Sequence, residues 1–206
     1  LVGFPDGAEG IFVTGTSMAN FIGVLVARTR ALGVRVRRAG VGDSRLTAYT
    51  SAASHGSIAR AMEFAGLGSD SLRVIAVNER DEMSLSDLQD AIDRDRAGGF
   101  VPFLLSGSAG TVDIGAVDDL NGLADIAARE EIWLHIDGAY GALGMLAPDI
   151  APRLRGMERA DSLAFDFHKW GQVPYDAGFV MVRDGELQRA TFASPAAYLT
   201  HDRRGM

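Results

Sequence analysis

The 206-residue sequence has no cysteine and only one lysine. Without cysteine, the chain can form neither disulfide bonds nor thiolate metal sites. Of its 20 basic residues, 19 are arginine and one, Lys169, is lysine. A guanidinium group stays protonated and cannot form a Schiff base, whereas a lysine amine can. The single lysine therefore indicates amine chemistry at Lys169; the alternative is one surface lysine retained by chance.

Long apolar runs and an excess of positive charge are also missing. No apolar segment reaches the ~18 residues that a membrane span needs, and no signal peptide is visible. The net charge of −7 and the pI near 5.0 argue against nucleic acid or an anionic membrane as the main partner. We therefore expect a cytoplasmic protein that acts on a small molecule. Because the chain begins with Leu1 rather than methionine, we also expect a piece of a longer protein.

Strand-like and helical segments alternate along the chain. Strands are predicted at 11–13, 46–50, 72–77, 100–105, 132–136, 163–165 and 179–182, and helices at 19–31, 57–65, 84–97 and 117–130. This alternation predicts an α/β fold, a mostly parallel sheet with helices on both faces. Ligands of such sheets bind beyond the carboxyl ends of the strands.

The segment 15–19, Gly-Thr-Ser-Met-Ala, allows two interpretations. The same run carries the nucleophilic serine of subtilisin-like proteases, but there the histidine and aspartate of the triad precede the serine. Here every histidine follows Ser17, so a hydrolase would have to recruit His55 or His135. The segment also follows a short strand and opens a helix, where Thr16 and Ser17 would suit a phosphate. An ordinary Ser/Thr N-cap is the alternative. We expect Ser17 to bind an anion.

Polar side chains follow the other predicted strands as well. Asp137 comes directly after the strand 132–136, where a carboxylate is costly to desolvate unless it is paired. His135 shares one face of that strand with Asp137 and could support it, or it could be a hydrogen-bonded core histidine. His55 and Thr111 also lie in loops after strands, and neither is informative alone.

Metal and dinucleotide sites are not predicted. The four histidines, which are far apart in the sequence and form no His-Glu-x-x-His pair, are His55, His135, His168 and His201. The segment around Ser17 lacks the further glycines of the dinucleotide fingerprint, and no Gly-Lys-Ser/Thr phosphate loop occurs.

Together these residues resemble the pyridoxal-phosphate-dependent group II amino-acid decarboxylases, the family of aromatic-amino-acid, histidine and glutamate decarboxylases. The most specific match is His-Lys-Trp at 168–170, after Ala-Asp-Ser at 160–162 and before Val-Pro-Tyr-Asp at 173–176. The run His-Ile-Asp-Gly-Ala-Tyr at 135–140 places its aspartate 32 residues before the lysine (169 − 137), as in that family. The resemblance covers nearly all 206 residues and implies the central part of a fold type I large domain, with the N-terminal segment and the C-terminal small domain outside this chain.

The resemblance implies a role for each of four polar residues. Lys169 would hold pyridoxal 5'-phosphate as an internal aldimine. Asp137 would keep the ring nitrogen protonated, so that the ring accepts electrons from the breaking Cα–carboxylate bond. His55 would stack on the ring and help to protonate the quinonoid, and His168 would flank the aldimine.

The phosphate and the second side of the ring are assigned in the same way. Thr16 and Ser17 would bind the phosphate, while Thr111 and Ala139 would line the ring. In that family Asn-Pro often precedes His-Lys, whereas Asp166-Phe167 stands here. Because a carboxylate repels a phosphate, no direct contact between Asp166 and the phosphate is expected.

The reaction implied is the decarboxylation of an L-amino acid, with an aromatic one preferred, to the amine and carbon dioxide by a homodimeric carboxy-lyase. Two alternatives stay open. One is a related lyase or aldehyde-forming enzyme with the same cofactor, and the other is a catalytically silent cofactor-binding module.

Overall fold

The computed structural model of the chain describes residues 2–194, so His201 lies outside the described residues. Its seven strands form one sheet in the order β1-β7-β6-β5-β4-β2-β3. The strands are β1 Glu9–Val13, β2 Leu46–Ser51, β3 Leu72–Ile75, β4 Val101–Ser108, β5 Trp133–Asp137, β6 Ser162–Asp166 and β7 Gly178–Val182. Among them only β7 runs against the rest, because it pairs antiparallel with both β1 and β6. The predicted mostly parallel sheet is confirmed.

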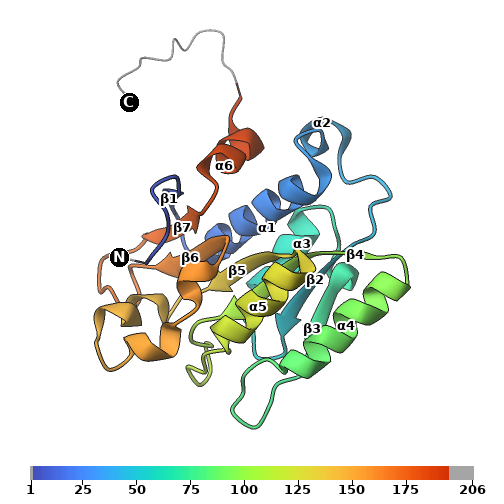
Figure 1. The fold of residues 1–206 in the computed structure, drawn as a ribbon. Helices are drawn as coiled ribbons and strands as arrows, with labels where there is room; N and C mark the ends of the chain where they lie inside the picture. The colour runs from blue at the N-terminus through green and yellow to red at the C-terminus, as the bar shows by residue number, and fades with distance from the viewer. Residues whose placement is uncertain (1, 195–206) are drawn as a thin grey trace.

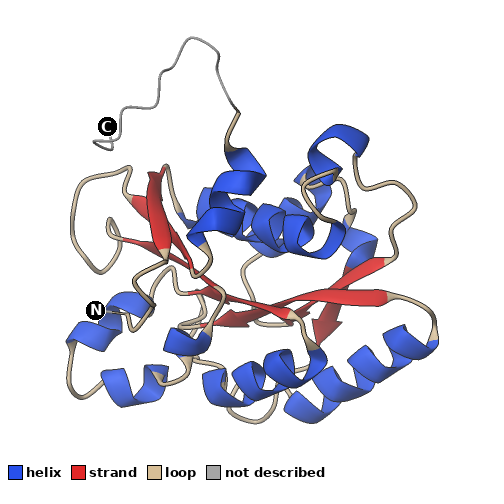
Figure 2. Cartoon of the chain, turned by 45° about the horizontal axis from the view of Figure 1, so that its top comes forward, coloured by secondary structure: helices blue, strands red, loops and turns tan. Residues whose placement is uncertain are grey.

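Helices cover both faces of this sheet, as predicted (Figures 1 and 2). The α-helices are α1 Thr16–Leu32, α2 Val36–Ala39, α3 Ser57–Phe64, α4 Leu85–Ala97, α5 Leu120–Glu130 and α6 Gly185–Phe192. Short 3-10 turns are η1 Ser69–Ser71, η2 Ala142–Leu146, η3 Ala151–Leu154 and η4 Met157–Arg159. Of the helices, α1, α3 and α6 pack on one face, and α4 and α5 pack on the other.

The two faces of the sheet carry separate hydrophobic cores. Successive residues of a strand point to opposite faces, so Leu104 joins the core under α1 and Leu105 joins the core under α4 and α5. The helix α1 is apolar nearly all round because the sheet covers one side of it, while α3 and α6 contact it elsewhere.

Several boundaries differ from those predicted. The strand β4 continues to Ser108, where a loop was expected from residue 106, because its residues 104–108 pair with β5. The helix predicted at 117–130 begins only at Leu120, since Asp119 caps it by accepting from the N–H of Gly122. The short helices α2 and α6 were not predicted. The helix predicted at 84–97 is confirmed, and Ser84 caps its start, because the Ser84 hydroxyl accepts from the N–H of Asp87.

The carboxyl ends of the central strands meet at one edge of the sheet. There Ser108 of β4 is in register with Asp137 of β5, and Asp137 is in register with Ala164 of β6. The start of α1 reaches the same edge through a close backbone approach, because a Cβ at Gly178 would lie 2.4 Å from the Cα of Gly15. Within residues 2–194, the helices are too short or too polar to cross a lipid bilayer.

Candidate functional site

A cavity of about 380 Å³ lies at this carboxyl edge. All of the site residues predicted from the sequence line it: Thr16, Ser17, His55, Thr111, Asp137, Ala139, His168 and Lys169. Ligand sites of parallel sheets occupy this position, because the loops that follow the strands converge there. The fold thus brings the whole predicted set to one place.

The start of α1 forms one wall of the cavity. Its N-cap residue, Gly15, provides no side-chain cap, and the first turn of the helix contains no acidic residue. Thr16 is buried and Ser17 is exposed. Unpaired N–H groups at the positive end of a helix attract anions. This wall therefore suits a phosphate, and the alternative of an ordinary Ser/Thr N-cap does not apply.

The amine of Lys169 faces a carboxylate and an aromatic ring. Its Nζ lies 3.0 Å from Oδ2 of Asp166, the last residue of β6, and 4.2 Å from the centre of the Tyr140 ring. The Lys169 side chain is 22% exposed, and that of Asp166 is 3% exposed. The amine is therefore held inside the cavity while it remains open to a ligand.

Asp137 ends β5 as a half-buried carboxylate that accepts hydrogen bonds from two donors. Oδ1 accepts from the N–H of Ala139 at 3.1 Å, and Oδ2 accepts from Nδ2 of Asn20 at 2.8 Å. Burial raises the pKa of Asp137, while these two hydrogen bonds and the charges of Lys169 and His55 oppose the rise. A cation at this carboxylate would be strongly favoured.

His168 is held in a fixed orientation. Its Nδ1 accepts from the N–H of Ala177 at 3.0 Å, and its ring lies 3.9 Å from the Tyr175 ring, tilted by 31°. Its Nε2 is 3.6 Å from Oδ2 of Asp166. Because Nδ1 accepts a hydrogen bond, a neutral His168 carries its own hydrogen on Nε2, facing that carboxylate.

The remaining predicted residues come from three loops. His55 is exposed, and its Nδ1 accepts from the N–H of Ser57 at 3.2 Å, so the ring is oriented by the start of α3. Thr111 is buried, and its hydroxyl accepts from the N–H of Ala116 at 3.1 Å. Ala139 donates its backbone N–H to Asp137.

Sequence reasoning missed two residues of the site. Asn20 lies fully buried within α1 and contacts Asp137; the signal was a single amide in an otherwise apolar helix. Asp166 lines the cavity, and a Cβ built on Gly15 would lie 3.9 Å from its Oδ1. Whether Asp166 avoids a bound phosphate stays a prediction.

Metal-binding side chains do not gather anywhere in residues 2–194, where no three His, Cys, Asp or Glu residues are grouped as ligands. His135 is fully buried, and both of its ring nitrogens are hydrogen-bonded, to the side chains of Ser162 and Asn20. Burial lowers its pKa to about 4. It therefore is a neutral core histidine.

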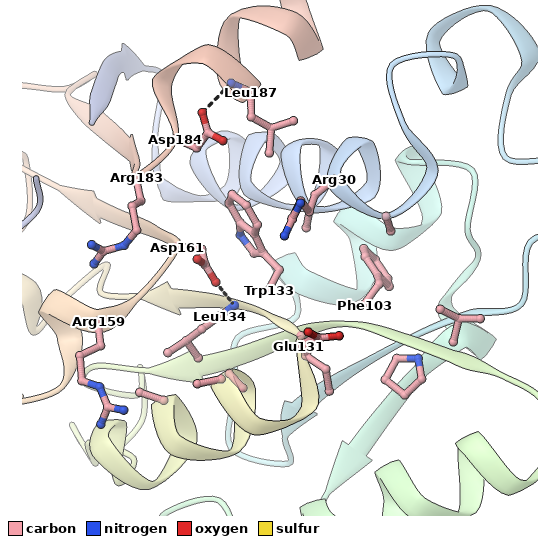
Figure 3. A pocket seen from close by; sticks show the side chains of 18 residues that line it. Arg30, Phe103, Glu131, Trp133, Leu134, Arg159, Asp161, Arg183, Asp184 and Leu187 are labelled. Atoms are coloured by element: carbon pink, nitrogen blue, oxygen red, sulfur yellow. Dashed lines mark hydrogen bonds between the residues drawn. The ribbon is translucent and has the colours of Figure 1, made fainter. Parts of the chain in front are cut away.

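A second, larger cavity of about 680 Å³ lies at the opposite edge of the sheet, where β4, β5 and β6 begin (Figure 3). Its charged lining residues are balanced, three of each sign: Arg30, Arg159, Arg183, Glu131, Asp161 and Asp184. Two of its acids already accept backbone hydrogen bonds, Asp161 from Leu134 and Asp184 from Leu187 (Figure 3). None of the predicted site residues lines it.

Comparison with known proteins agrees with this geometry. Residues 1–206 match the family described as the pyridoxal-dependent decarboxylase conserved domain. The aromatic-L-amino-acid decarboxylase of Bacillus atrophaeus is 40% identical over 199 residues, which are 97% of this chain and 40% of the relative. The cysteine sulfinic acid decarboxylase of Rattus norvegicus is 36% identical over 200 residues, again 97% and 40%. The chain belongs to the pyridoxal-dependent decarboxylase family.

Solved structures give the same result for the fold. Mouse CSAD in its apo form has a TM-score of 0.92 and 33% identity, over 98% of this chain and 42% of that one. The 4-hydroxyphenylacetaldehyde synthase of Rhodiola rosea has a TM-score of 0.85 and 28% identity, over 94% and 42%. The chain thus spans about two fifths of the length of these relatives, and the predicted fold type I architecture is confirmed.

Proposed function

We propose that this chain forms the cofactor-binding part of a pyridoxal-phosphate-dependent amino-acid decarboxylase. One observation carries the proposal: the chain's only lysine lies in the same cavity as a half-buried carboxylate, Asp137, and an uncapped helix start. These are the three groups that a pyridine aldehyde with a phosphate needs. When bound, such a cofactor supplies an electron sink for the bond broken at Cα.

The cavity fits such a group in its polar lining. Within residues 2–194, two buried oxygens of its wall, Oγ1 of Thr16 and Oδ1 of Asp166, have no hydrogen-bond partner. Buried polar atoms are normally paired, so an unpaired hydroxyl beside a helix start is explained by a ligand that accepts from it. We assign Thr16 and Ser17 to the phosphate and Lys169 to the aldehyde carbon.

The other side chains orient the ring and move protons. Asp137 provides the anion that keeps the ring nitrogen protonated, because a carboxylate in a low-dielectric wall attracts a nearby cation strongly. Ala139, Thr111 and His55 line the same cavity and would hold the ring. His168, whose Nδ1 accepts from the N–H of Ala177, would offer an Nε2 hydrogen to a ligand in this cavity.

Within this function we propose an aromatic L-amino acid as the substrate. No arginine is among the residues described as lining the cavity, so an acidic side chain such as a sulfinate would lack its usual bidentate partner there. The aromatic-amino-acid decarboxylase is also the more similar of the two relatives, at 40% against 36% identity.

A partner subunit is proposed for the rim of the cavity. The exposed apolar side chains Val112 and Tyr175 line it, and Ile114, Trp170 and Val173 are exposed in the same two loops. Large exposed apolar side chains of this kind are typical of interfaces, which supports a homodimer of the complete protein. The measured mass in solution tests this, and a monomer with full activity would contradict it. The cytoplasmic location stays a prediction.

Product analysis tests the proposed function. The complete protein, loaded with pyridoxal phosphate, is incubated with one amino acid at a time: L-tryptophan, L-tyrosine, L-cysteine sulfinate or L-2,4-diaminobutyrate. We expect equal amounts of carbon dioxide and amine from an aromatic substrate. An aldehyde with ammonia would favour the alternative that the Rhodiola likeness supports. No turnover with bound cofactor would favour a silent cofactor-binding module.

A further inference from the structure

Asn20 is the buried residue through which α1 contacts β5. Its Nδ2 donates to Oδ2 of Asp137 at 2.8 Å and to Oγ of Ser57 at 2.9 Å, and its Oδ1 is 2.9 Å from Nε2 of His135. The amide orientation is fixed by chemistry, because the reverse orientation would place two acceptor oxygens 2.8 Å apart. The amide NH2 of Asn20 therefore faces Asp137, and its carbonyl oxygen faces His135.

The tautomer of His135 follows from Asn20. An amide oxygen only accepts, so Nε2 of His135 carries the hydrogen. Burial lowers the pKa of His135 to about 4, so the ring is neutral and its Nδ1 is an acceptor. The partner of Nδ1 is Oγ of Ser162 at 2.8 Å, which therefore donates to it.

Ser162 in turn is set by a tryptophan. The indole N–H of Trp133, which can only donate, lies 2.8 Å from Oγ of Ser162. Every donor then points the same way, from Trp133 through Ser162, His135 and Asn20 to Asp137. Aligned hydrogen bonds polarise one another, so the last donor in such a row is strengthened. The row begins at the wall of the second cavity, which Trp133 lines (Figure 3).

The helix is shaped to admit this row. Gly23 lies three residues after Asn20, on the same side of α1, and a Cβ there would be 2.7 Å from both Cε1 and Nδ1 of His135. Glycine is unfavourable within a helix, so a glycine here is explained by the space that the imidazole needs.

We propose that Asn20 is a positioning residue, which connects Asp137 to this row of donors and thereby holds the carboxylate as an anion in one orientation for a protonated ring nitrogen. The inference rests on the proposed function. The other groups that face the carboxylate are the Ala139 N–H, Lys169 and His55, and none of them belongs to the row. Removal of Asn20 leaves them in place, so its contribution can be isolated.

The test measures the proton on the cofactor directly. The complete protein is loaded with pyridoxal phosphate labelled with ¹⁵N in the ring, and the ¹⁵N chemical shift is recorded near neutral pH. In Asn20→Leu the carboxylate loses one donor and becomes the stronger base, so the shared proton moves from the ring nitrogen toward Asp137. One hydrogen bond to a charged group corresponds to about a ten- to hundred-fold change in this proton distribution.

Thr29→Val is the matched control. Thr29 is a buried polar residue of the same helix, and among the described residues its hydroxyl bonds to the carbonyl of Leu25 alone. The ¹⁵N shift of the cofactor in Thr29→Val should therefore equal that in the wild type. If Asn20→Leu does not fold, Ser162→Ala interrupts the row two residues before Asn20 and should give a smaller shift in the same direction. A wild-type ¹⁵N shift in the variant that folds would overturn the inference alone. An unprotonated ring nitrogen in the wild type, or no bound cofactor, would overturn the proposed function as well.

Discussion

Nζ of Lys169 lies 3.0 Å from Oδ2 of Asp166, so the chain's only lysine is paired with a carboxylate that is 3% exposed. This carboxylate has a consequence for an incoming phosphate-bearing aldehyde, because it adds negative charge to the wall that is to receive the phosphate.

Asp166→Asn should therefore strengthen the binding of pyridoxal phosphate. The amide removes the charge, keeps the shape and can donate to a phosphate oxygen, so we expect the apparent affinity to rise by about ten-fold. Equilibrium titration of the complete apo protein measures this. Asp161→Asn is the matched control. Asp161 precedes the first residue of β6 and lines the larger cavity of about 680 Å³, so this substitution should not change the affinity for pyridoxal phosphate. Weaker binding in Asp166→Asn would show that the carboxylate stabilises the bound cofactor.

Reductive labelling should mark one residue of this chain. Because Lys169 is its only lysine, borohydride treatment after incubation with pyridoxal phosphate should attach the cofactor to the peptide that contains it. Peptide mass spectrometry locates the label, and Lys169→Arg should abolish it, since a guanidinium does not form the bond. The protein must be shown to be folded before it is labelled. If the only labelled peptide of this chain then carried the label at an amino terminus, Lys169 would not be the residue that binds the aldehyde.

The pH dependence of stability should report on His135. In the unfolded chain histidine titrates near 6.5, whereas burial lowers the folded pKa to about 4. The folded state binds fewer protons in that window, so this contribution is complete above about pH 6.5 and is lost as the pH falls toward 4. Between pH 7 and pH 5 the loss should be about 2 kcal/mol.

His135→Gln should remove this part of the pH dependence, because glutamine does not titrate. The free energy of unfolding is compared at the two pH values for the wild type and His135→Gln. An equal loss of stability with falling pH in His135→Gln would mean that other groups cause it.

The sequence predicted the sheet and the polar residues after its strands because both depend on local pattern. Short apolar runs in the sequence indicate β4 and β5 without knowledge of their neighbours. A single lysine among arginines is likewise visible in the sequence alone. The direction of β7 was not predictable, since a short apolar run is the same in either direction. The late start of α5 depends on one side chain, Asp119, which caps the helix inside a segment that has helical periodicity throughout.

Contacts between distant segments could not be predicted from the sequence. Asn20 and Asp137 are 117 residues apart, and only the packing of α1 across β5 makes them partners. Asp166 was visible as a departure from the family's Asn-Pro, but its pairing with Lys169 depends on the turn that follows β6. The hydrogen-bond row through His135 combines three separate segments, so periodicity alone could at most suggest that His135 supports Asp137.

Ser17 allows the sharpest test of the helix start. If its hydroxyl binds the phosphate, Ser17→Ala loses one hydrogen bond to a charged group, roughly 1.5–3 kcal/mol. The affinity for pyridoxal phosphate should then fall by about ten- to a hundred-fold, while that for dephosphorylated pyridoxal should barely change. Ser86→Ala, an exposed serine on α4 and far from the cavity, is the control.

Equilibrium titration of both cofactor forms against both variants separates the two interpretations of this segment. A loss specific to the phosphorylated form supports anion binding at the uncapped start of α1. An equal loss for both forms would mean that the hydroxyl contributes to folding or to the ring. A serine-directed fluorophosphonate provides the opposite test: if Ser17 were a nucleophile, the wild-type protein would be labelled there and pyridoxal phosphate would not compete. Because no histidine is hydrogen-bonded to Ser17 among the described residues, we expect no labelling.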